Sequence, residues 1–487
     1  MPGRTAKPHV FNVQSSLSKR NTSVIKRVFR YNSNIIYPCT LTSTPSDNGS
    51  ERSKLFPGLQ LLTMPNSKNI LISGAGIAGP ALAFLLTRCG HKCTIVERAS
   101  QFRNAGQQID ISGNGLKVVK LMGLYHQAKE ISCGESGLRF VNAKNETQAE
   151  FKAEDSDDKF TFVKDIEIMR GALADLLKNV TEHDTEYIFG NYITALREQD
   201  SCISVSFNEG LDRDFDLVVA ADGLGSKTRG LVFNKDEVKY NSLNQCFALM
   251  SIPYEKQDGT WARWLAAPGR RCVFLRPRPN EGVTGAYLAF IGPDSGKIGR
   301  ASAEEQKIEF ARRFKDVDWE VPRILRELKS DRMVNFYAQE VAQVNTTNWV
   351  KGRVVLLGDA GYCPSPITGQ GTSLAFIGAY ILAGCITSMP NDLPSALLQY
   401  EKQLRPFVEK LQKLPPGGPK ILNPETTWGI RILWTCLYSA SVLQGFGARV
   451  LQYIIEPLSA IFGSKELVLP TYPSLEPALV KEDSAKS

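Results

Sequence analysis

The chain has 487 residues, of which 43 % are apolar and 22 % are charged, as is typical of a folded protein with two or three domains. Most of its net charge of +8 comes from the first 50 residues, which carry seven Lys or Arg and one acid, and the remainder is close to neutral, so the charge gives little reason to expect nucleic acid as a partner. The ten Cys include no C-x-x-C pair, and the cluster Cys89-Gly-His91-Lys-Cys93 lacks the fourth ligand of a metal centre. We therefore expect no metal, and free thiols in a reducing compartment.

Residues 1–66 differ from the rest of the chain in being basic, rich in Ser, Thr, Asn and Pro, and nearly free of acids. This composition is typical of an organelle transit segment. The alternative is a disordered extension upstream of a second start at Met64. The first interpretation predicts an organellar protein, and the second a cytoplasmic one.

Ordered sequence begins at Lys68. The pattern predicts a strand over Asn69–Ser73, a glycine turn over Gly74–Gly79, a helix over Pro80–Arg88 and a strand over Cys93–Glu97. This order of strand, turn, helix and strand is that of a dinucleotide-binding unit.

The turn fits the pattern G-x-G-x-x-G. Gly74 permits the tight turn, Gly76 lets the backbone approach a pyrophosphate, and Gly79 lets the helix pack close to the strand. The helix N-terminus offers unpaired N–H groups to that anion. Glu97 follows Gly79 by 18 residues at the end of the next strand, where an acid can bind a ribose diol.

Later segments divide into helical and extended patterns. Helices are expected over Gly113–Met122, Ile168–Lys178, Gly371–Thr387 and Leu393–Lys413. Strands are expected over Glu186–Phe189, Ile203–Phe207, Phe215–Ala220, Arg271–Arg276, Thr284–Phe290 and Gly352–Leu357. The alternation between Gln245 and Phe290 predicts an antiparallel sheet in a second domain.

Two of the apolar strands end in acids. Asp216-Leu-Val-Val-Ala-Ala-Asp222-Gly223 ends in Asp-Gly and is followed by a turn of small residues and Arg229. Val354-Val-Leu-Leu-Gly358-Asp359 ends in Gly-Asp and is followed by a loop rich in Pro and Gly.

The glycine loop, the Asp-Gly segment and the Gly-Asp segment, in this order and spacing, resemble the single-component FAD-dependent monooxygenases. That family includes para-hydroxybenzoate hydroxylase, salicylate hydroxylase and the tetracycline-inactivating flavoenzymes. The resemblance covers roughly residues 68–410 and is strongest toward the tetracycline-inactivating subgroup and its fungal relatives in secondary metabolism.

The resemblance implies which residues bind FAD. Gly74, Gly76 and Gly79 would face its pyrophosphate, and Glu97 its adenosine ribose. The remaining implied contacts are Gln107 and Gln108 in the loop along the cofactor, Arg170 at a helix start, Asp222 toward FAD and NADPH, Asp359 at the ribitol chain, and Gly371 and Thr372 at the isoalloxazine.

This chain departs from the family near the expected flavin. Tyr362 stands where relatives carry His after the Gly-Asp segment, and Thr372-Ser373-Leu374 lacks their usual Asn. In the glycine-rich loop, Gln107 and Gln108 replace small residues, which favours contact through side chains. No catalytic residue is assigned; Trp261, Arg263, Trp264, Arg276 and Arg278 lie on strands of the expected substrate domain, where core or surface positions are the more common outcome.

The fold class implied is α/β. A Rossmann-like FAD-binding domain with a mixed sheet is expected from residues 67–180, 210–240 and 350–390, and an antiparallel-sheet substrate domain mainly from residues 181–209 and 241–349. Residues 391–487 form a C-terminal helical region. In this reading NAD(P)H reduces FAD, and the reduced flavin and O2 then hydroxylate or epoxidise a small organic molecule. A dehydrogenase, an oxidase or a halogenase of the same fold is the alternative.

Residues 428–462 are apolar with helical periodicity. Their longest uncharged run, Ile432–Ala448, falls just short of the roughly 18 residues that cross a bilayer. We expect a helix that bridges the two domains; peripheral membrane contact is the other reading. The latter motivates a further alternative, a membrane-associated flavin-binding protein without turnover.

Overall fold

The computed structural model describes residues 66–102, 106–153, 166–210, 212–330, 334–414, 416–443 and 467–479. The expected N-terminal extension, save Asn66, and most of the C-terminal apolar segment lie outside these ranges.

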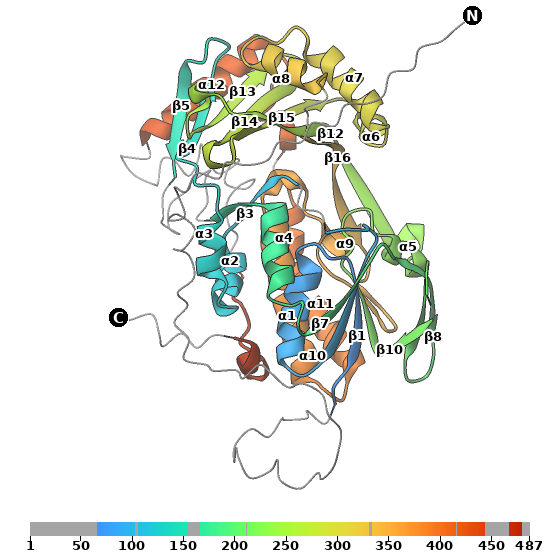
Figure 1. Cartoon of the computed structure of the whole chain (residues 1–487). Helices are drawn as coiled ribbons and strands as arrows, with labels where there is room; N and C mark the ends of the chain where they lie inside the picture. Colours follow the sequence, from blue (N-terminus) through green and yellow to red (C-terminus); the bar gives the residue numbers. More distant parts are fainter. Residues whose placement is uncertain are drawn as a thin grey trace, which may run out of the picture. The chain divides into compact units, whose positions relative to one another are not determined.

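The first of two large layers is built on a six-stranded sheet with the strand order β17-β18-β11-β1-β2-β7 (Figure 1). All its pairs are parallel except that of β17 with β18. The central strands β1, β11 and β18 are buried, mainly apolar runs, as expected for a parallel sheet covered on both faces. The six strands are β1 (Asn69–Ser73), β2 (Lys92–Glu97), β7 (Thr185–Phe189), β11 (Leu217–Ala220), β17 (Val350–Lys351) and β18 (Val354–Leu356).

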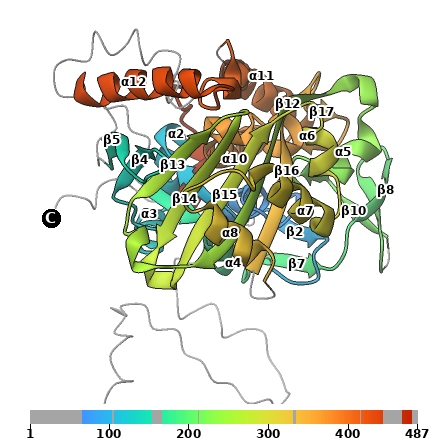
Figure 2. The same ribbon diagram turned by 90° about the horizontal axis from the view of Figure 1, so that it is seen from above.

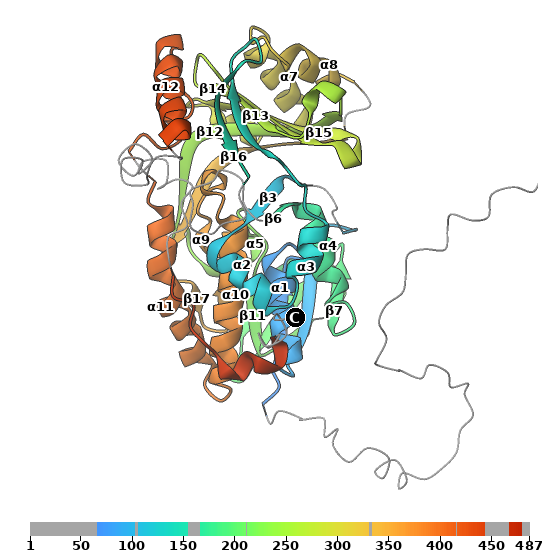
Figure 3. The ribbon, with the colours of Figure 1, turned by 90° about the vertical axis from the view of Figure 1, so that its left-hand side faces the viewer.

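Helices cover one face of this sheet (Figures 1 and 3). At its centre lies α10 (Gly371–Ser388), which packs against α1 and is apolar on every side because it is buried on every side. It is the one helix among the described residues that is long and apolar enough to span a membrane, and 78 % of it is buried in the protein. The other helices of this layer are α1 (Ala78–Arg88), α2 (Gly113–Leu121), α3 (Tyr125–Glu130), α4 (Arg170–Asn179) and α11 (Leu393–Gln412).

A small antiparallel sheet, β10-β9-β8, covers the other face. Its strands are β8 (Ile193–Glu198), β9 (Ile203–Phe207) and β10 (Arg213–Phe215). The expectation that residues 181–209 belong to the substrate domain was therefore wrong. Strand β7 extends the parallel sheet beside β2, and the alternating apolar residues of β8 and β9 pack on that sheet.

The second large layer is a seven-stranded sheet in the order β16-β12-β15-β14-β13-β4-β5, antiparallel except between β13 and β4. Figure 2 shows α7 and α8 over one face. The strands are β4 (Gly137–Val141), β5 (Thr147–Lys152), β12 (Val238–Pro253), β13 (Ala262–Ala267), β14 (Arg271–Arg278), β15 (Val283–Ile291) and β16 (Val334–Thr346). The helices are α6 (Ser295–Gly299), α7 (Ala303–Phe314) and α8 (Val321–Leu328).

This sheet confirms the expected antiparallel second domain, with a correction at its edge. Strands β4 and β5 were expected in the FAD-binding domain, within residues 67–180, but β4 pairs with β13 and β5 pairs with β4 at the edge of this sheet. No strand was predicted over these residues, and an alternating pattern shows which face of a strand is buried and not which sheet it joins.

Helix α12 (Thr427–Leu443) packs on β4, β5 and β13, as Figure 3 shows. Leu433, Leu437 and Ala440 are buried there, while Trp428 and Tyr438 on the opposite side are exposed. The described part of this segment therefore covers one sheet and does not bridge the two domains, contrary to expectation. Nothing in its packing supports membrane contact.

A two-stranded ribbon, β3 (Gln108–Ile111) with β6 (Ile166–Met169), lies beside the first layer. Ile168 was expected to start a helix, but it pairs with Ile109, and α4 begins at Arg170. Two short helices follow the acid-ending strands, α5 (Lys227–Val232) after β11 and α9 (Asp359–Tyr362) after β18.

Candidate functional site

A cavity of about 430 Å³ lies at the carboxyl ends of β1, β2, β11 and β18. Ligands of open α/β sheets bind at this edge. Every cofactor-binding residue expected from the sequence lines the cavity except Gly79, which lies behind the loop: Gly74, Gly76, Glu97, Gln107, Gln108, Arg170, Asp222, Asp359, Gly371 and Thr372. The fold therefore brings together side chains that are up to about 300 residues apart in the sequence.

The glycine loop has the geometry that its sequence requires. Gly74 has a φ of +111°, and a Cβ there would lie 2.6 Å from the carbonyl oxygen of Ala221. A Cβ on Gly79 would lie 2.2 Å from the carbonyl oxygen of Gly74, so this glycine allows α1 to pack against the strand. At Gly76 the nearest atom to a Cβ is Nη2 of Arg170, at 3.1 Å. Gly76 thus leaves open a cradle that an alanine would fill.

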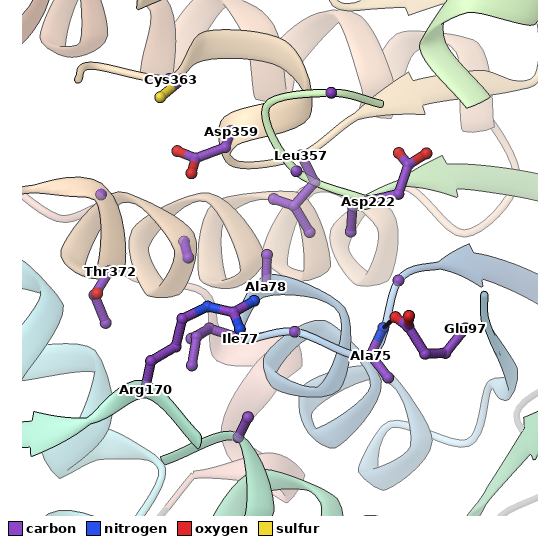
Figure 4. Close-up of a pocket in the computed structure, with 18 of the residues that line it drawn as sticks. Ala75, Ile77, Ala78, Glu97, Arg170, Asp222, Leu357, Asp359, Cys363 and Thr372 are labelled. Atoms are coloured by element: carbon purple, nitrogen blue, oxygen red, sulfur yellow. Dashed lines mark hydrogen bonds between the residues drawn. The ribbon is translucent and has the colours of Figure 1, made fainter. Parts of the chain in front are cut away.

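Glu97 ends β2 and closes the loop from one side (Figure 4). Its Oε2 accepts from the backbone N–H of Ala75 at 3.0 Å, and its Oε1 accepts from that of Ala99 at 2.9 Å. The carboxylate is therefore fixed in place at the cavity wall, and each oxygen keeps acceptor capacity for a ligand hydroxyl.

Arg170 reaches the loop from the start of α4. Its backbone N–H donates to Gln107 at 2.9 Å, which ties α4 to the segment before β3. In Figure 4 its guanidinium extends toward Ile77 and Ala78 at the N-terminus of α1. A forked cation beside a helix N-terminus is suited to a phosphate group.

The Asp222 carboxylate stabilises the turn that follows it. It accepts from the Ser226 hydroxyl, and from the N–H and hydroxyl of Thr228 at 3.1 and 3.0 Å. Arg229 donates to the carbonyl oxygens of Ala360 and Leu224, and so holds the turn against α9. The Asp-Gly segment therefore shapes one wall of the cavity.

Asp359 begins α9 and faces the cavity across from Arg170 (Figure 4). Burial raises the pKa of its carboxyl, while a hydrogen bond with the Cys363 thiol and the charge of Arg170 lower it. The first turn of α10, with Gly371 and Thr372, adds a helix N-terminus that carries no acidic residue and no side-chain cap. That end of the cavity favours negative charge on a ligand.

The two departures from the family pattern have structural explanations. Tyr362 points into the core, where its hydroxyl lies 2.8 Å from that of Tyr400 and its ring lies 4.4 Å from that of Trp349. Ser373 accepts from the backbone N–H of Ser112 at 3.2 Å and thereby joins α10 to α2. Neither side chain lines the cavity.

Of the candidates named on substrate-domain strands, only Arg276 lines the cavity. Arg263 pairs with buried Asp258 at 2.8 Å, and Trp264 packs on Phe274. Arg278 pairs with Glu281, and Trp261 lies under Arg139.

Sequence reasoning did not single out the cavity-lining Asp110, Lys227 or Cys363. Of these three, only Asp110 could have been inferred from the sequence, because it lies two residues after Gln108 and therefore on the same face of β3. Gln108 itself turns its amide nitrogen to Glu135, at 2.9 Å, and so serves a contact between the sheets. Among the described residues no His lines the cavity and no group of side chains could hold a metal ion.

The donor set fits a flavin dinucleotide. The cradle at Gly76 with Arg170 suits a pyrophosphate, and Glu97 suits a ribose. Asp359 stands where a ribitol hydroxyl can bind, and the N-terminus of α10 suits the electron-rich edge of a reduced ring.

Comparison with known proteins gives the same answer. A model of the FAD binding domain matches residues 67–414. The FAD-dependent monooxygenase asL6 of Sarocladium schorii is 33 % identical over 429 residues, which cover 84 % of this chain and 98 % of that protein. The flavin-dependent monooxygenase eupH of a Phoma species is 32 % identical over 393 residues, covering 76 % of this chain and 91 % of that protein. The crystal structure of the tetracycline destructase Tet(55) matches with a TM-score of 0.68 and 31 % identity, covering 84 % of this chain and all of that one.

Proposed function

The chain belongs to the family of FAD-dependent monooxygenases, and from that premise we propose that it uses NAD(P)H and O2 to hydroxylate or epoxidise a small organic molecule in secondary metabolism. The observation that carries the proposal is the cavity, in which Glu97, Arg170 and Asp359 come together beside two helix N-termini. Fungal relatives such as asL6 and eupH support a role in secondary metabolism.

Bound FAD supplies the redox chemistry, in which electrons from NAD(P)H are passed to O2. The protein binds and orients the cofactor. The N–H groups at the start of α1 and the Arg170 guanidinium would hold the pyrophosphate, and Glu97 would bind the ribose. Asp359 would accept from the ribitol chain.

The end of the cavity near α10 stabilises negative charge on the reduced ring. The first turn of α10 contributes partial positive charge, and no acid of its own opposes this. Loop 364–370, which contains Pro364 and Pro366, leads into this turn and stiffens it. In the described residues around the cavity Cys363 is the only cysteine, so nothing there resembles the cysteine pair of a disulfide reductase.

The test is a two-step mixing experiment. Purified protein should be yellow, and its flavin absorbance should fall when NADPH or NADH is added without oxygen. Mixing the reduced protein with ¹⁸O₂ and a panel of phenols and polycyclic aromatic ketones should then yield a product that carries one ¹⁸O atom. A colourless protein, or bound FAD that neither nicotinamide reduces, contradicts the proposal.

The same experiment separates the alternatives within the fold. An oxidase consumes ¹⁸O₂ and a dehydrogenase uses another electron acceptor, and neither gives a product that carries ¹⁸O. A halogenase requires added halide, and its product carries the halogen and no ¹⁸O. Protein that binds FAD but oxidises no NAD(P)H supports a flavin-binding protein without turnover.

A further inference from the structure

A buried ionic cluster lies where β14 of the seven-stranded sheet meets the β3–β6 ribbon. Arg276 donates from Nε and Nη2 to the two carboxylate oxygens of Glu135, at 2.8 and 2.9 Å. Its Nη2 also lies 2.9 Å from Oε1 of Glu167. The side chains of Arg276, Glu135 and Glu167 are 9 %, 0 % and 4 % exposed. Two almost completely buried carboxyl groups thus share one guanidinium.

The charges of this cluster balance only if it holds a proton. A second buried carboxylate with no cation of its own would be costly, so two carboxyls that share a site retain one proton between them. The two carboxyl groups are close neighbours, because Nη2 of Arg276 lies 2.9 Å from an oxygen of each and Nε2 of Gln108 donates to both, at 2.9 and 3.4 Å. Burial, with Glu135 and Asp110, raises the pKa of Glu167 well above its ordinary value against the pull of Arg276.

Arg276 stays charged. Burial alone would lower its pKa, but Glu135 and Glu167 outweigh burial and raise it. The other titratable groups around the cluster are Asp110, Cys133, Tyr287 and Arg278, and Arg278 is paired with Glu281. The cluster itself therefore carries one positive and one negative charge, and its net charge is zero.

One edge of this guanidinium is left for a ligand. Arg276 lines the cavity, together with Gln108 and Asp110. Its Nε and Nη2 are taken by the carboxylates, and no hydrogen bond joins its Nη1 to any residue that the structure describes. The fixed fork holds Nη1 in one place, so its N–H groups are preorganised donors.

We propose that Arg276 is a specificity-determining residue, whose Nη1 donates to an oxygen of a neutral substrate, and that Glu135 and Glu167 are positioning residues that cancel its charge with one proton between them. The inference rests on the proposed function, since it names the substrate class of the same site. A carbonyl or hydroxyl oxygen gains this hydrogen bond at little cost. A carboxylate would lose its hydration to reach a site with no net positive charge.

Benzamide and benzoate test the substrate class, because they share a shape and differ in charge. Their binding to FAD-loaded protein is followed by the change in flavin absorbance. Wild-type protein should bind benzamide at least as tightly as benzoate. The double variant E135Q/E167Q leaves Arg276 unpaired, so benzoate affinity should rise about tenfold while benzamide affinity stays within threefold. Tighter binding of benzoate to wild-type protein, or a wild-type spectrum that neither compound changes, overturns the assignment.

The single variants test how many protons Glu135 and Glu167 hold between them. After Glu135→Gln or Glu167→Gln, the remaining carboxyl gives up its proton and stays paired with Arg276, so the net charge is unchanged. Each single variant should alter the ratio of affinities for reduced and oxidised FAD by less than threefold. The double variant should raise this ratio tenfold, or about 30 mV in the two-electron midpoint potential. A tenfold rise in either single variant shows that both carboxyls are ionised and overturns the proposal, even where the double variant fails to fold.

Two controls complete the design. Glu281→Gln removes an exposed carboxylate from Arg278 and should match wild type in both measurements. Arg276→Gln should bind FAD within threefold of wild type, and a tenfold loss would assign the donor to the flavin and not to the substrate. These measurements need bound FAD only, so they can fail while NAD(P)H reduction succeeds, and the reverse.

Discussion

Replacing Gly76 and Gly79 separately by alanine should separate cofactor binding from folding. A Cβ on Gly79 would lie 2.2 Å from the carbonyl oxygen of Gly74, and this backbone atom cannot yield unless α1 moves away from the loop. A Cβ on Gly76 would meet only the end of the flexible Arg170 side chain, at 3.1 Å. The two neighbouring glycines therefore protect different properties of the protein.

The expected magnitudes follow from these contacts. Gly79→Ala overpacks a rigid site and should lower the free energy of unfolding of the apoprotein by about 1–3 kcal/mol. Gly76→Ala should change it by less than about 0.5 kcal/mol, since Arg170 can turn aside. The new methyl group would keep the pyrophosphate from the loop, and losing one hydrogen bond to a charged group, about 1.5–3 kcal/mol, weakens FAD binding roughly 10- to 150-fold.

Urea unfolding of the apoprotein and titration with FAD, followed by flavin fluorescence, measure the two properties. Gly230→Ala in α5 is the matched control, because a Cβ there meets nothing within 4 Å; it should leave FAD binding unchanged and should not lower stability, since alanine favours a helix over glycine by up to about 1 kcal/mol. The reasoning is refuted if Gly76→Ala binds FAD as wild type does, or if it destabilises the apoprotein as much as Gly79→Ala.

Three further substitutions probe other parts of the chain. Glu97→Gln should weaken FAD binding about tenfold at unchanged stability, in the same titration, because the carboxylate is a stronger acceptor than the amide; equal affinity would remove Glu97 from the site. Burial lowers the pKa of His91 from 6.5 to about 4, so between these pH values His91 is protonated in the unfolded chain and neutral in the folded one. Stability should fall between pH 6.5 and pH 4 by up to about 3 kcal/mol in urea unfolding, and His91→Gln should flatten this slope. Asp258 is 2 % exposed and accepts from Arg323 at 2.8 and 2.9 Å, so Asp258→Asn should cost about 3–5 kcal/mol by the same method, against almost nothing for exposed Glu281→Gln.

The parts of the site with a local signature were predictable from the sequence. The glycine loop and Glu97 form one β–α–β unit, and chemistry and spacing define it within 30 residues. Asp222 and Asp359 were recognised as acids that end apolar strands and were assigned to FAD through the family resemblance; in the structure the carboxyl ends of these parallel strands meet at one edge of the sheet. Arg170 was placed only through the family resemblance.

The parts that depend on pairing between distant segments were not predictable. Glu135 lies in a loop with no periodic signal, and its role appears only when β14 brings Arg276 to it. Residues 185–189 and 137–152 were assigned to the wrong domains, since a strand's pattern shows which of its faces is buried and not which partner it meets. The position of helix α12 was mispredicted for the same reason, because an apolar helix face could pack on either domain.

The order of strands in the six-stranded sheet also sets when the enzyme can acquire its cofactor. β1 lies between β2 and β11, and β11 lies between β1 and β18. The segments that line the cavity are therefore distant in the sequence and are synthesised at different times. From Gly76 to Ala375, both at the cavity, the ribosome adds 299 residues. At a synthesis rate of roughly 5–20 residues per second, about 15–60 s pass between the synthesis of the glycine loop and that of the last part of the cavity wall. Until β11 emerges, β1 has a partner strand on the β2 edge only, and loading with FAD belongs to the period after the ribosome has passed α10.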